Sequence, residues 1–247
     1  MADDAKLPIT RQIEKESRES GAPPADVHLQ AVEDCCIYDR HGMSIPFKSL
    51  YQDRKSIIIF VRNFLCYSCK EYVDDLSKIP KEVLEGAEVS LVVIGQSAHH
   101  HIVPFCSQTG YPHDIYVDPQ RIIYQKLGMK REEKFTISAQ ASPHVKSGVF
   151  MGQLKSIWRA MTSPAFDFQG DLHQQGGAII AGPGNVSLTS ISVDQSTIHA
   201  DSFAGSQVHF SHFDMNRLDH MPINWLLQLA GVQHIVNFSE KAKVIHV

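Results

Sequence analysis

Short, largely apolar runs alternate with segments of helical spacing in the first half of the chain. The runs cover residues 57–61, 89–95 and 114–119 and contain mainly Ile and Val among their apolar residues, as strands buried on both faces of a sheet usually do. Between the first two runs, residues 68–87 place apolar side chains every three or four positions, which predicts an amphipathic helix. This alternation predicts an α/β fold with a largely parallel sheet.

Antiparallel signals occur on either side of this pattern. Residues 39–42, Asp-Arg-His-Gly, indicate a turn between two short extended pieces. Residues 176–182 form another apolar run, and residues 208–213 alternate in the way expected of an antiparallel partner. A closing helix is predicted from Pro222 to Gly231, because Gly is favoured just after helix ends.

Individual residues mark the expected helix boundaries. Ser68 followed by Glu71 matches a capping box, which places the start of the first helix at Ser68. Pro80 is expected to kink or divide this helix. Pro104 is expected to interrupt a second helix, predicted over residues 97–111.

The N-terminal residues differ in composition from the rest of the chain. Residues 1–34 hold 4 Lys and Arg against 8 Asp and Glu, which accounts for the net charge of −4. We predict a disordered acidic tail over 1–28 and one domain over 29–247. A Ser-rich stretch at 186–207 predicts a flexible insertion; because its removal would join residue 185 to the next strand, a gene-prediction artefact is the alternative.

The overall composition is that of a soluble globular protein, with 43% hydrophobic and 20% charged residues. The chain contains neither an apolar run long enough to span a membrane nor a basic stripe, so neither a membrane nor a nucleic acid is expected as a partner. Its polar, acidic start does not resemble a secretory or mitochondrial leader. The sequence therefore predicts a cytoplasmic protein, with the nucleus as a second location.

Cys66 and Cys69 lie three positions apart where the strand at 57–61 gives way to the predicted helix. Unpaired N–H groups and the helix dipole stabilise a thiolate at such a helix start. We therefore expect Cys66 to attack an O–O or S–S bond and Cys69, one turn into the helix, to resolve the product to a disulfide. Arg62 and Lys70 are the nearby cations that would add positive charge.

Other interpretations of these residues stay open. Zinc would require a second pair of ligands, which the adjacent Cys35 and Cys36 are poorly spaced to supply, and inert packing of the two cysteines is the remaining alternative. The three histidines at 99–101 would point about 100° apart on a helix and would not converge on a metal. No Gly-x-Gly-x-x-Gly follows a strand, so no nucleotide cofactor is expected.

Longer stretches of the sequence carry a family resemblance that covers about residues 29–247. They include FVRNFLCYSCKEYVDDLSKIP, VIGQSAHHHIVPFC, YVDPQRIIYQKLGMKR, QQGGAIIAGPGN and NRLDHMPIN. With these stretches the chain resembles the peroxiredoxin-like 2 family, in the AhpC/TSA antioxidant-enzyme branch of the thioredoxin-like superfamily. The resemblance implies a thioredoxin-like fold, with a central mixed sheet flanked by helices.

The resemblance also implies thiol oxidoreductase activity, with Cys66 attacking and Cys69 resolving. It implies no bound cofactor or metal, a small peroxide or disulfide substrate, and an external thiol reductant such as thioredoxin or glutathione. Peroxiredoxins have Pro-x-x-x-Thr-x-x-Cys, whereas this chain has Ile59 and Asn63 at those two positions. They also use an Arg on a later strand; QQGGAII has none, which leaves Arg62 as the candidate.

A non-enzymatic function is the competing interpretation. The missing peroxiredoxin groups would suit a redox-responsive regulatory protein that uses a thioredoxin-like scaffold to bind partners. The C-terminal Val-Ile-His-Val at 244–247 is compatible with strand addition to a PDZ domain.

Overall fold

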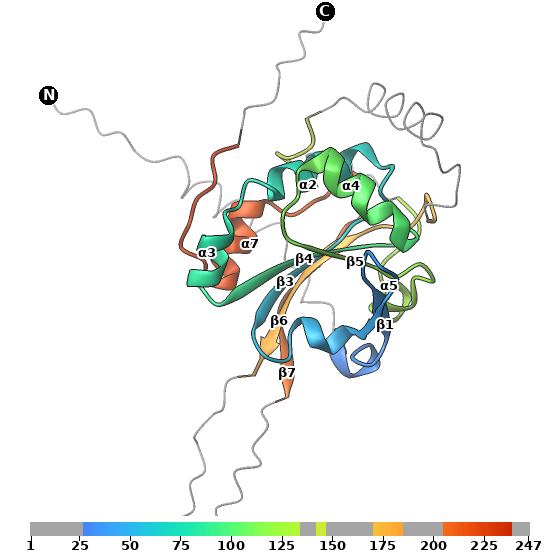
Figure 1. Cartoon of the computed structure of the whole chain (residues 1–247), viewed down its shortest axis with the longest axis horizontal. Helices are drawn as coiled ribbons and strands as arrows, with labels where there is room; N and C mark the ends of the chain where they lie inside the picture. The colour runs from blue at the N-terminus through green and yellow to red at the C-terminus, as the bar shows by residue number, and fades with distance from the viewer. Residues whose placement is uncertain (1–26, 134–141, 147–169, 185–204, 239–247) are drawn as a thin grey trace, which may run out of the picture.

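A mixed sheet organises the part of the chain that the computed structural model describes, namely residues 27–133, 142–146, 170–184 and 205–238 (Figure 1). The sheet has seven strands in the order β2-β1-β5-β4-β3-β6-β7. The strands are β1 Cys36–Tyr38, β2 Ser44–Pro46, β3 Lys55–Phe60, β4 Val89–Gly95, β5 Asp114–Val117, β6 Gly177–Pro183 and β7 Ser206–Phe213. Each run predicted from sequence as a strand overlaps one of them, with the ends differing by up to two residues.

Only the three strands β3, β4 and β5 are parallel to one another. The β1–β2 hairpin pairs antiparallel with β5, and β6 and β7 extend the sheet antiparallel from β3. The expectation of a largely parallel sheet was therefore wrong, because the helical crossovers that make strands parallel occur only between β3, β4 and β5. The mixed sheet implied by the family resemblance is confirmed.

The α-helices are α2 Tyr67–Leu76, α3 Lys81–Gly86, α4 Ile102–Thr109, α5 Ile122–Lys126 and α7 Ile223–Ala230. The 3₁₀ turns are η1 Leu29–Ala31, η2 Phe47–Leu50 and η3 His99–His101. Pro80 separates α2 from α3, as expected, and is the residue just before α3. Pro104 does not interrupt its helix, because α4 begins at Ile102 and a first-turn Pro costs no intrahelical bond.

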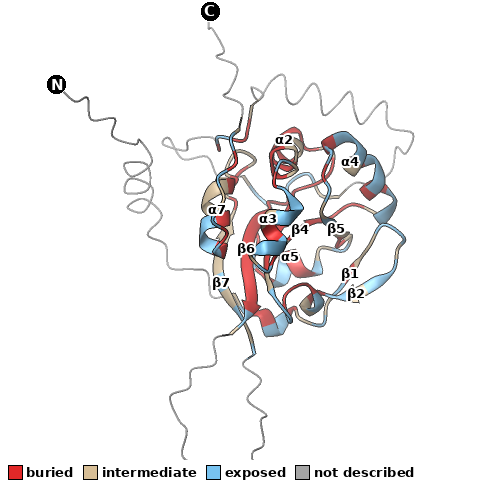
Figure 2. Ribbon diagram, turned by 60° about the vertical axis from the view of Figure 1, so that its left-hand side comes forward, coloured by how far each residue is buried: buried red, intermediate tan, exposed pale blue. Residues whose placement is uncertain are grey.

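Strand β3 divides the apolar core into two layers, because successive side chains of a strand face opposite sides. Ile57 and Ile59 pack with residues of α2, α3, α4 and α7, whereas Ile58 and Phe60 pack with residues of η1, η2 and α5. The central strands are accordingly buried throughout (Figure 2). Four strands in the order β4-β3-β6-β7, joined as βαβ and then ββα, form the thioredoxin-like fold.

Several expectations fall on residues outside this description. They are most of the acidic tail, residues 186–204 of the Ser-rich stretch, and the C-terminal four residues. At the end of the Ser-rich stretch, Ser206 and Gln207 belong to β7 and pair with Pro183 and Gly182. No helix of the described residues is long and apolar enough to cross a membrane.

Three strand ends meet at one end of the sheet. Gly177, the first residue of β6, pairs with Phe60 at the end of β3 and with Phe213 at the end of β7. The preceding residue, Gly176, runs so close to β3 that a Cβ there would overlap the carbonyl of Phe60. This close approach lets the loops that follow β3 and β7 lie side by side.

Replacing Gly176 with Ala should therefore lower the free energy of unfolding, by about 1–3 kcal/mol. Gly86→Ala is the matched control, because Gly86 ends α3 and a Cβ there has nothing within 4 Å. That change should instead raise stability by up to about 1 kcal/mol. Urea unfolding followed by circular dichroism measures both, and equal effects of the two changes would contradict the close approach.

Candidate active site

Cys66 is the residue immediately before α2, the helix that follows β3. Its backbone is extended, with φ −63° and ψ 121°, and its N–H donates to the Asn63 carbonyl at 3.2 Å. The Asn63 amide oxygen accepts the Leu65 N–H at 3.1 Å. Asn63, at the position of the peroxiredoxin Thr, thus shapes the turn that delivers Cys66 to the helix start.

The Cys66 sulfur is surrounded by hydrogen-bond donors although its residue is only 8% exposed. Ser68 Oγ lies 3.1 Å from Sγ, and Arg62 Nη1 donates to it at 3.9 Å. A hydrogen bond from the Cys69 thiol, helped by the Arg62 charge and by Ser68, holds the pKa of Cys66 well below its ordinary value despite burial. The expectation of an activated helix-start thiol is consistent with this geometry.

Cys69 is completely buried one turn into α2, and both cysteines are free thiols. Burial raises the pKa of Cys69 well above its ordinary value, and its interaction with Cys66 raises it further. The two sulfurs therefore differ sharply, with the thiolate favoured at Cys66 and the thiol at Cys69. This is the order of acidity expected of an attacking and a resolving cysteine.

Arg62 follows the end of β3 and is almost entirely buried, with 5% of the residue exposed. Its Nε donates to the Gln174 carbonyl at 3.2 Å and its Nη2 to the Leu172 carbonyl at 2.5 Å. Nη2 also lies 3.2 Å from Glu133 Oε1. These contacts leave Nη1 directed at Cys66, so Arg62 occupies the place predicted for it.

Glu133 and Arg217 extend this charged cluster, and sequence reasoning missed both. Arg217 donates to the two oxygens of Glu133, at 2.8 and 2.7 Å. Glu133 thereby joins two guanidinium groups, one of which contacts Cys66. Because these residues are 71 and more positions from Arg62 in the chain, no local pattern could have indicated the cluster.

The segment that supplies carbonyls to Arg62 is itself anchored to the sheet. The Gln96 side chain, at the end of β4, accepts the Asp171 N–H at 2.9 Å and donates to the Asp171 and Arg62 carbonyls. The Asp171 carboxylate binds Arg121 and Arg131, each at 2.6 Å. The loop before β6 is therefore fixed relative to β3, and the position of Arg62 is fixed with it.

Two residues predicted near the site have other contacts. The Lys70 ammonium pairs with Asp74 one turn along α2, at 2.9 Å, and the structure shows no contact between it and Cys66. Ser68 does not cap the helix, since α2 begins at Tyr67 and Cys66 is therefore the N-cap residue. The capping box was therefore wrong: Ser68 contacts the Cys66 sulfur, and Glu71 accepts the Lys146 N–H at 2.6 Å.

Two histidines contact the ring of Tyr72, which lies one turn after Cys69. His220 stacks on Tyr72 with ring centroids 4.9 Å apart, and His144 meets it edge-on at 5.4 Å. The Tyr72 hydroxyl donates to the Met221 carbonyl at 2.7 Å, which ties the loop after β7 to α2. Neither histidine was singled out from sequence, because each reaches α2 only through the tertiary fold.

Asp75 anchors the far end of α2. Its fully buried carboxylate lies 2.9 Å from His144 Nδ1 and 2.5 Å from the ammonium groups of both Lys78 and Lys146. Burial opposes ionisation, but hydrogen bonds from His144 and the two lysines outweigh it and lower the pKa of Asp75. Asp75 thus holds residues 142–146 against the helix.

The described residues contain no group of three His, Cys, Asp or Glu side chains that could hold a metal. Of residues 99–101, which form η3, only His101 is buried. Cys36 is exposed and Cys35 half-buried, so neither is a fully buried packing residue. Within the part of the chain described, the chemistry gathers at Cys66 and its neighbours.

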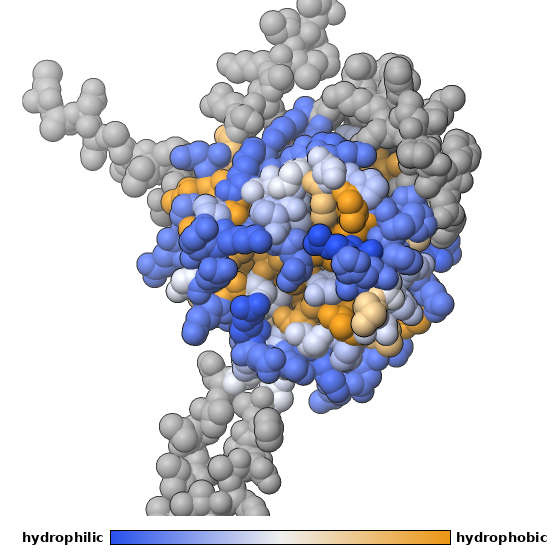
Figure 3. Space-filling view, in the orientation of Figure 1, coloured by the Kyte–Doolittle hydropathy of each residue, from blue (hydrophilic) through white to orange (hydrophobic). Residues whose placement is uncertain are grey.

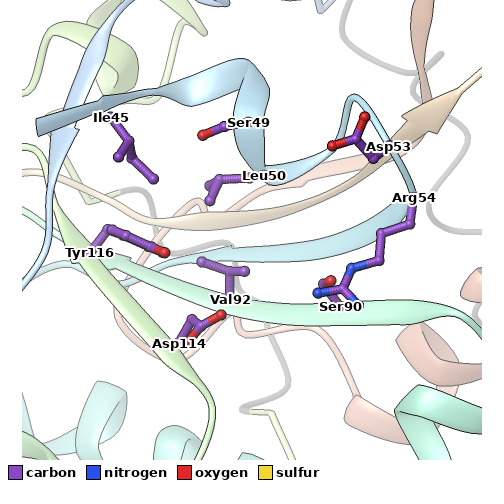
Figure 4. A pocket seen from close by; sticks show the side chains of 9 residues that line it. All are labelled: Ile45, Ser49, Leu50, Asp53, Arg54, Ser90, Val92, Asp114 and Tyr116. Atoms are coloured by element: carbon purple, nitrogen blue, oxygen red, sulfur yellow. The ribbon is translucent and has the colours of Figure 1, made fainter.

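A separate groove, with a volume of about 450 Å³, lies at the other end of the parallel strands. Ser90 and Val92 of β4 and Asp114 and Tyr116 of β5 line one side. The other side is lined by Ile45, Ser49, Leu50, Asp53 and Arg54 (Figure 4). On the face shown in Figure 3 hydrophilic residues predominate, and hydrophobic ones show in patches between them. The groove contains no cysteine and does not include the thiol site.

Replacing Asp75 with Asn should lower the free energy of unfolding by about 1–3 kcal/mol at pH 7, because the partly exposed ammonium groups of Lys78 and Lys146 lose their counter-charge and the buried His144 ring loses its carboxylate partner. The folded-state pKa of Asp75 is lowered, so its contribution is complete above the ordinary carboxyl pKa and is lost as the pH falls below it. The deficit should therefore shrink below about pH 4. Asp74→Asn, in the partly exposed pair with Lys70, should cost about 0.5 kcal/mol in the same unfolding experiment.

The Arg62 contact predicts a specific alkylation profile for Cys66. Iodoacetamide should modify Cys66 and spare Cys69 at pH 7, and the rate should reach half its maximum below the pH of about 8.5 typical of free thiols. Arg62→Gln should slow this reaction at pH 7 by at least ~3-fold, since it removes the charge beside the thiolate.

Lys70→Gln is the control for Arg62→Gln, because Asp74 already engages that ammonium. Its alkylation profile should overlay that of the unmodified protein, as measured by mass spectrometry of the labelled peptides. An equal slowing by both substitutions would mean that general positive charge, rather than the Arg62 contact, sets the reactivity.

Comparison with known proteins places the chain in a family. A model of the AhpC/TSA antioxidant enzymes matches residues 75–192, a range that begins after the two cysteines. A solved structure of the peroxidoxin BcpB from Mycobacterium tuberculosis aligns with a TM-score of 0.47 at 11% identity, over 86% of this chain and 98% of that one.

Two curated relatives match by sequence. The prostamide/prostaglandin F synthase of Aquarana catesbeiana is 27% identical over 58% of this chain and 67% of its own length. The peroxiredoxin-like 2C protein of Takifugu rubripes is 65% identical over 97% of each chain. At that identity and coverage, the chain belongs to the peroxiredoxin-like 2 family.

Proposed function

We propose that the protein is a thiol oxidoreductase that reduces a peroxide or disulfide at Cys66 and stores the oxidation as a Cys66–Cys69 disulfide. The observation that carries this proposal is the contrast between the two sulfurs on one helical turn. Cys66 has a lowered pKa beside Arg62, whereas Cys69 is fully buried with a raised pKa. Family membership supports a redox-related function of this kind.

The first step uses the Cys66 thiolate as a nucleophile. It attacks one peroxide oxygen, so that an S–O bond forms, the O–O bond breaks and sulfur is oxidised to a sulfenic acid. The other oxygen leaves as an alkoxide or hydroxide and takes up one proton. Arg62, with Nη1 directed at the sulfur, is placed to stabilise the negative charge that moves onto the leaving oxygen.

The second step uses the Cys69 thiol. It attacks the Cys66 sulfur, the S–S bond forms, the S–O bond breaks and hydroxide leaves with the Cys69 proton as water. Cys66 immediately precedes α2 and Cys69 lies in its first turn, where a Cys-x-x-Cys spacing permits the bond. An external dithiol then supplies two electrons and two protons to restore both thiols.

An organic peroxide is the substrate class that we favour. One relative is named a prostamide/prostaglandin F synthase, which suggests that an O–O bond in an apolar molecule is a suitable substrate. In this chain Leu172, whose carbonyl holds Arg62, is 66% exposed. It offers an apolar contact close to the charged site.

Stoichiometric organic hydroperoxide should remove two hydrogens from the reduced protein, mapped by mass spectrometry to a Cys66–Cys69 bond. Cys66→Ser should abolish this loss, and Cys69→Ser should stop at a sulfenic acid that dimedone traps. Cys106→Ser, on the half-buried face of α4, should behave like the unmodified protein. Slow oxidation scattered over all five cysteines would contradict the proposal.

Turnover separates an enzyme from a regulatory switch. With excess thioredoxin and its reductase, an enzyme consumes peroxide continuously, so that NADPH loss exceeds one equivalent per protein many times over. A redox-responsive regulator would be oxidised once, and its reduction would be too slow to sustain NADPH consumption. We expect continuous consumption, dependent on both Cys66 and Cys69.

A further inference from the structure

The two histidines that contact Tyr72 make nearly the same carboxylate contact but differ at the other ring nitrogen. His144 Nδ1 lies 2.9 Å from Asp75, and His220 Nδ1 lies 2.9 Å from Asp214. The Nε2 of His144 accepts the N–H of Ile223 at 3.0 Å, so it carries no proton. Both ring nitrogens of His144 therefore have partners, and the neutral ring links α2 to α7.

His220 differs from His144 in the hydrogen bonding of its Nε2 atom. Its residue is 6% exposed, and its Nε2 is buried without a hydrogen-bond partner among the described residues. A buried polar nitrogen without a partner costs on the order of 1–3 kcal/mol, so its retention calls for an explanation. A proton exchanged with substrate or water during reaction would supply one.

His220 belongs to the same end of the sheet as the reactive thiol. Asp214 follows β7 and its N–H donates to the Gly176 carbonyl at 3.0 Å, beside the end of β3. The His220 ring stacks on Tyr72 of α2, the helix that begins at the two cysteines. The Cys66 thiolate contributes to raising the pKa of His220 and the Arg62 charge to lowering it, as expected of groups at the same end of the sheet.

We propose, building on the proposed function, that His220 is the proton donor of the thiol site and that Asp214 holds it in position. In the reduced protein the proton lost by Cys66 resides on His220, giving a thiolate–imidazolium pair. When the thiolate breaks an O–O bond, His220 gives that proton to the departing alkoxide, directly or through one water, and becomes neutral. The Cys69 proton leaves with hydroxide in the next step, and the reducing dithiol returns both protons.

The ionisation of the groups around His220 supports this assignment. Burial alone would lower the pKa of His220, but the Asp214 carboxylate and, more weakly, the Cys66 thiolate raise it above its ordinary value; Arg62 opposes them. His212, whose Nε2 lies 3.6 Å from both Asp214 and Asp219, is the other titratable ring of this cluster. By contrast, burial lowers the pKa of His144 in spite of Asp75.

The first test is an NMR titration of the histidine rings in the full chain, which needs no catalysis. With Cys66 as a thiolate, His220 should titrate above the ordinary histidine pKa of about 6.5. Cys66→Ser removes the negative charge and should lower the His220 midpoint, while His144 stays neutral in both proteins. An unchanged His220 midpoint would overturn the proposed pair.

The second test follows oxidation of Cys66 by organic hydroperoxide in stopped flow between pH 5 and pH 9. Donation requires the protonated ring, so the rate per Cys66 thiolate should fall as the pH rises through the pKa of His220. His220→Gln should remove this fall and slow the reaction at pH 7 by about tenfold or more. Asp214→Asn should shift the fall to lower pH, because the imidazolium loses its counter-charge.

His144→Gln is the matched control, since it also removes a buried histidine that contacts Tyr72. It should lower stability and leave the shape of the pH–rate profile unchanged. If the unmodified protein forms no Cys66–Cys69 disulfide, the proposed function fails. If the disulfide forms and the pH–rate profile of His220→Gln overlays that of the unmodified protein, only the proton-donor assignment fails. If His220→Gln does not fold, Asp214→Asn and the NMR titration of the unmodified protein decide.

Discussion

The buried guanidinium of Arg62 is the constraint on which the rest of the site depends. A charge removed from water costs several kcal/mol unless it is paired and hydrogen-bonded, and Arg62 is only 5% exposed. Glu133 supplies the counter-charge, and the Leu172 and Gln174 carbonyls accept two further donors. With those partners satisfied, the remaining donor Nη1 is directed at Cys66.

This requirement also explains why the loop before β6 is so firmly attached. A carbonyl can satisfy a buried cation only if its backbone cannot move away, and Gln96 and Asp171 provide that attachment. The close packing of Gly176 on β3 brings the same loop to the end of the strand that leads to Cys66. Sheet geometry and site electrostatics are therefore parts of one arrangement.

The two ends of α2 have different roles, one chemical and one structural. The two sulfurs at its start differ in pKa because the Cys66 sulfur accepts a hydrogen bond from the Cys69 thiol and lies beside Arg62 and Ser68, whereas burial raises the pKa of Cys69. Its last turn carries Asp75, whose ion pairs with Lys78 and Lys146 and hydrogen bond with His144 fasten neighbouring segments. Tyr72 lies between these ends and contacts both histidines.

The sequence by itself determined the strands and the position of the thiol pair and offered two candidate cations near it, Arg62 and Lys70, because these depend on local spacing and short-range order. The structure decided what local spacing cannot encode. Ser68 turned to Cys66 rather than capping the helix, Lys70 paired with Asp74, and the sheet became mixed because hairpins flank its parallel centre. Glu133, Arg217 and His220 reach the site from loops far away in the chain, since burying charge there required partners that only the tertiary fold could bring together.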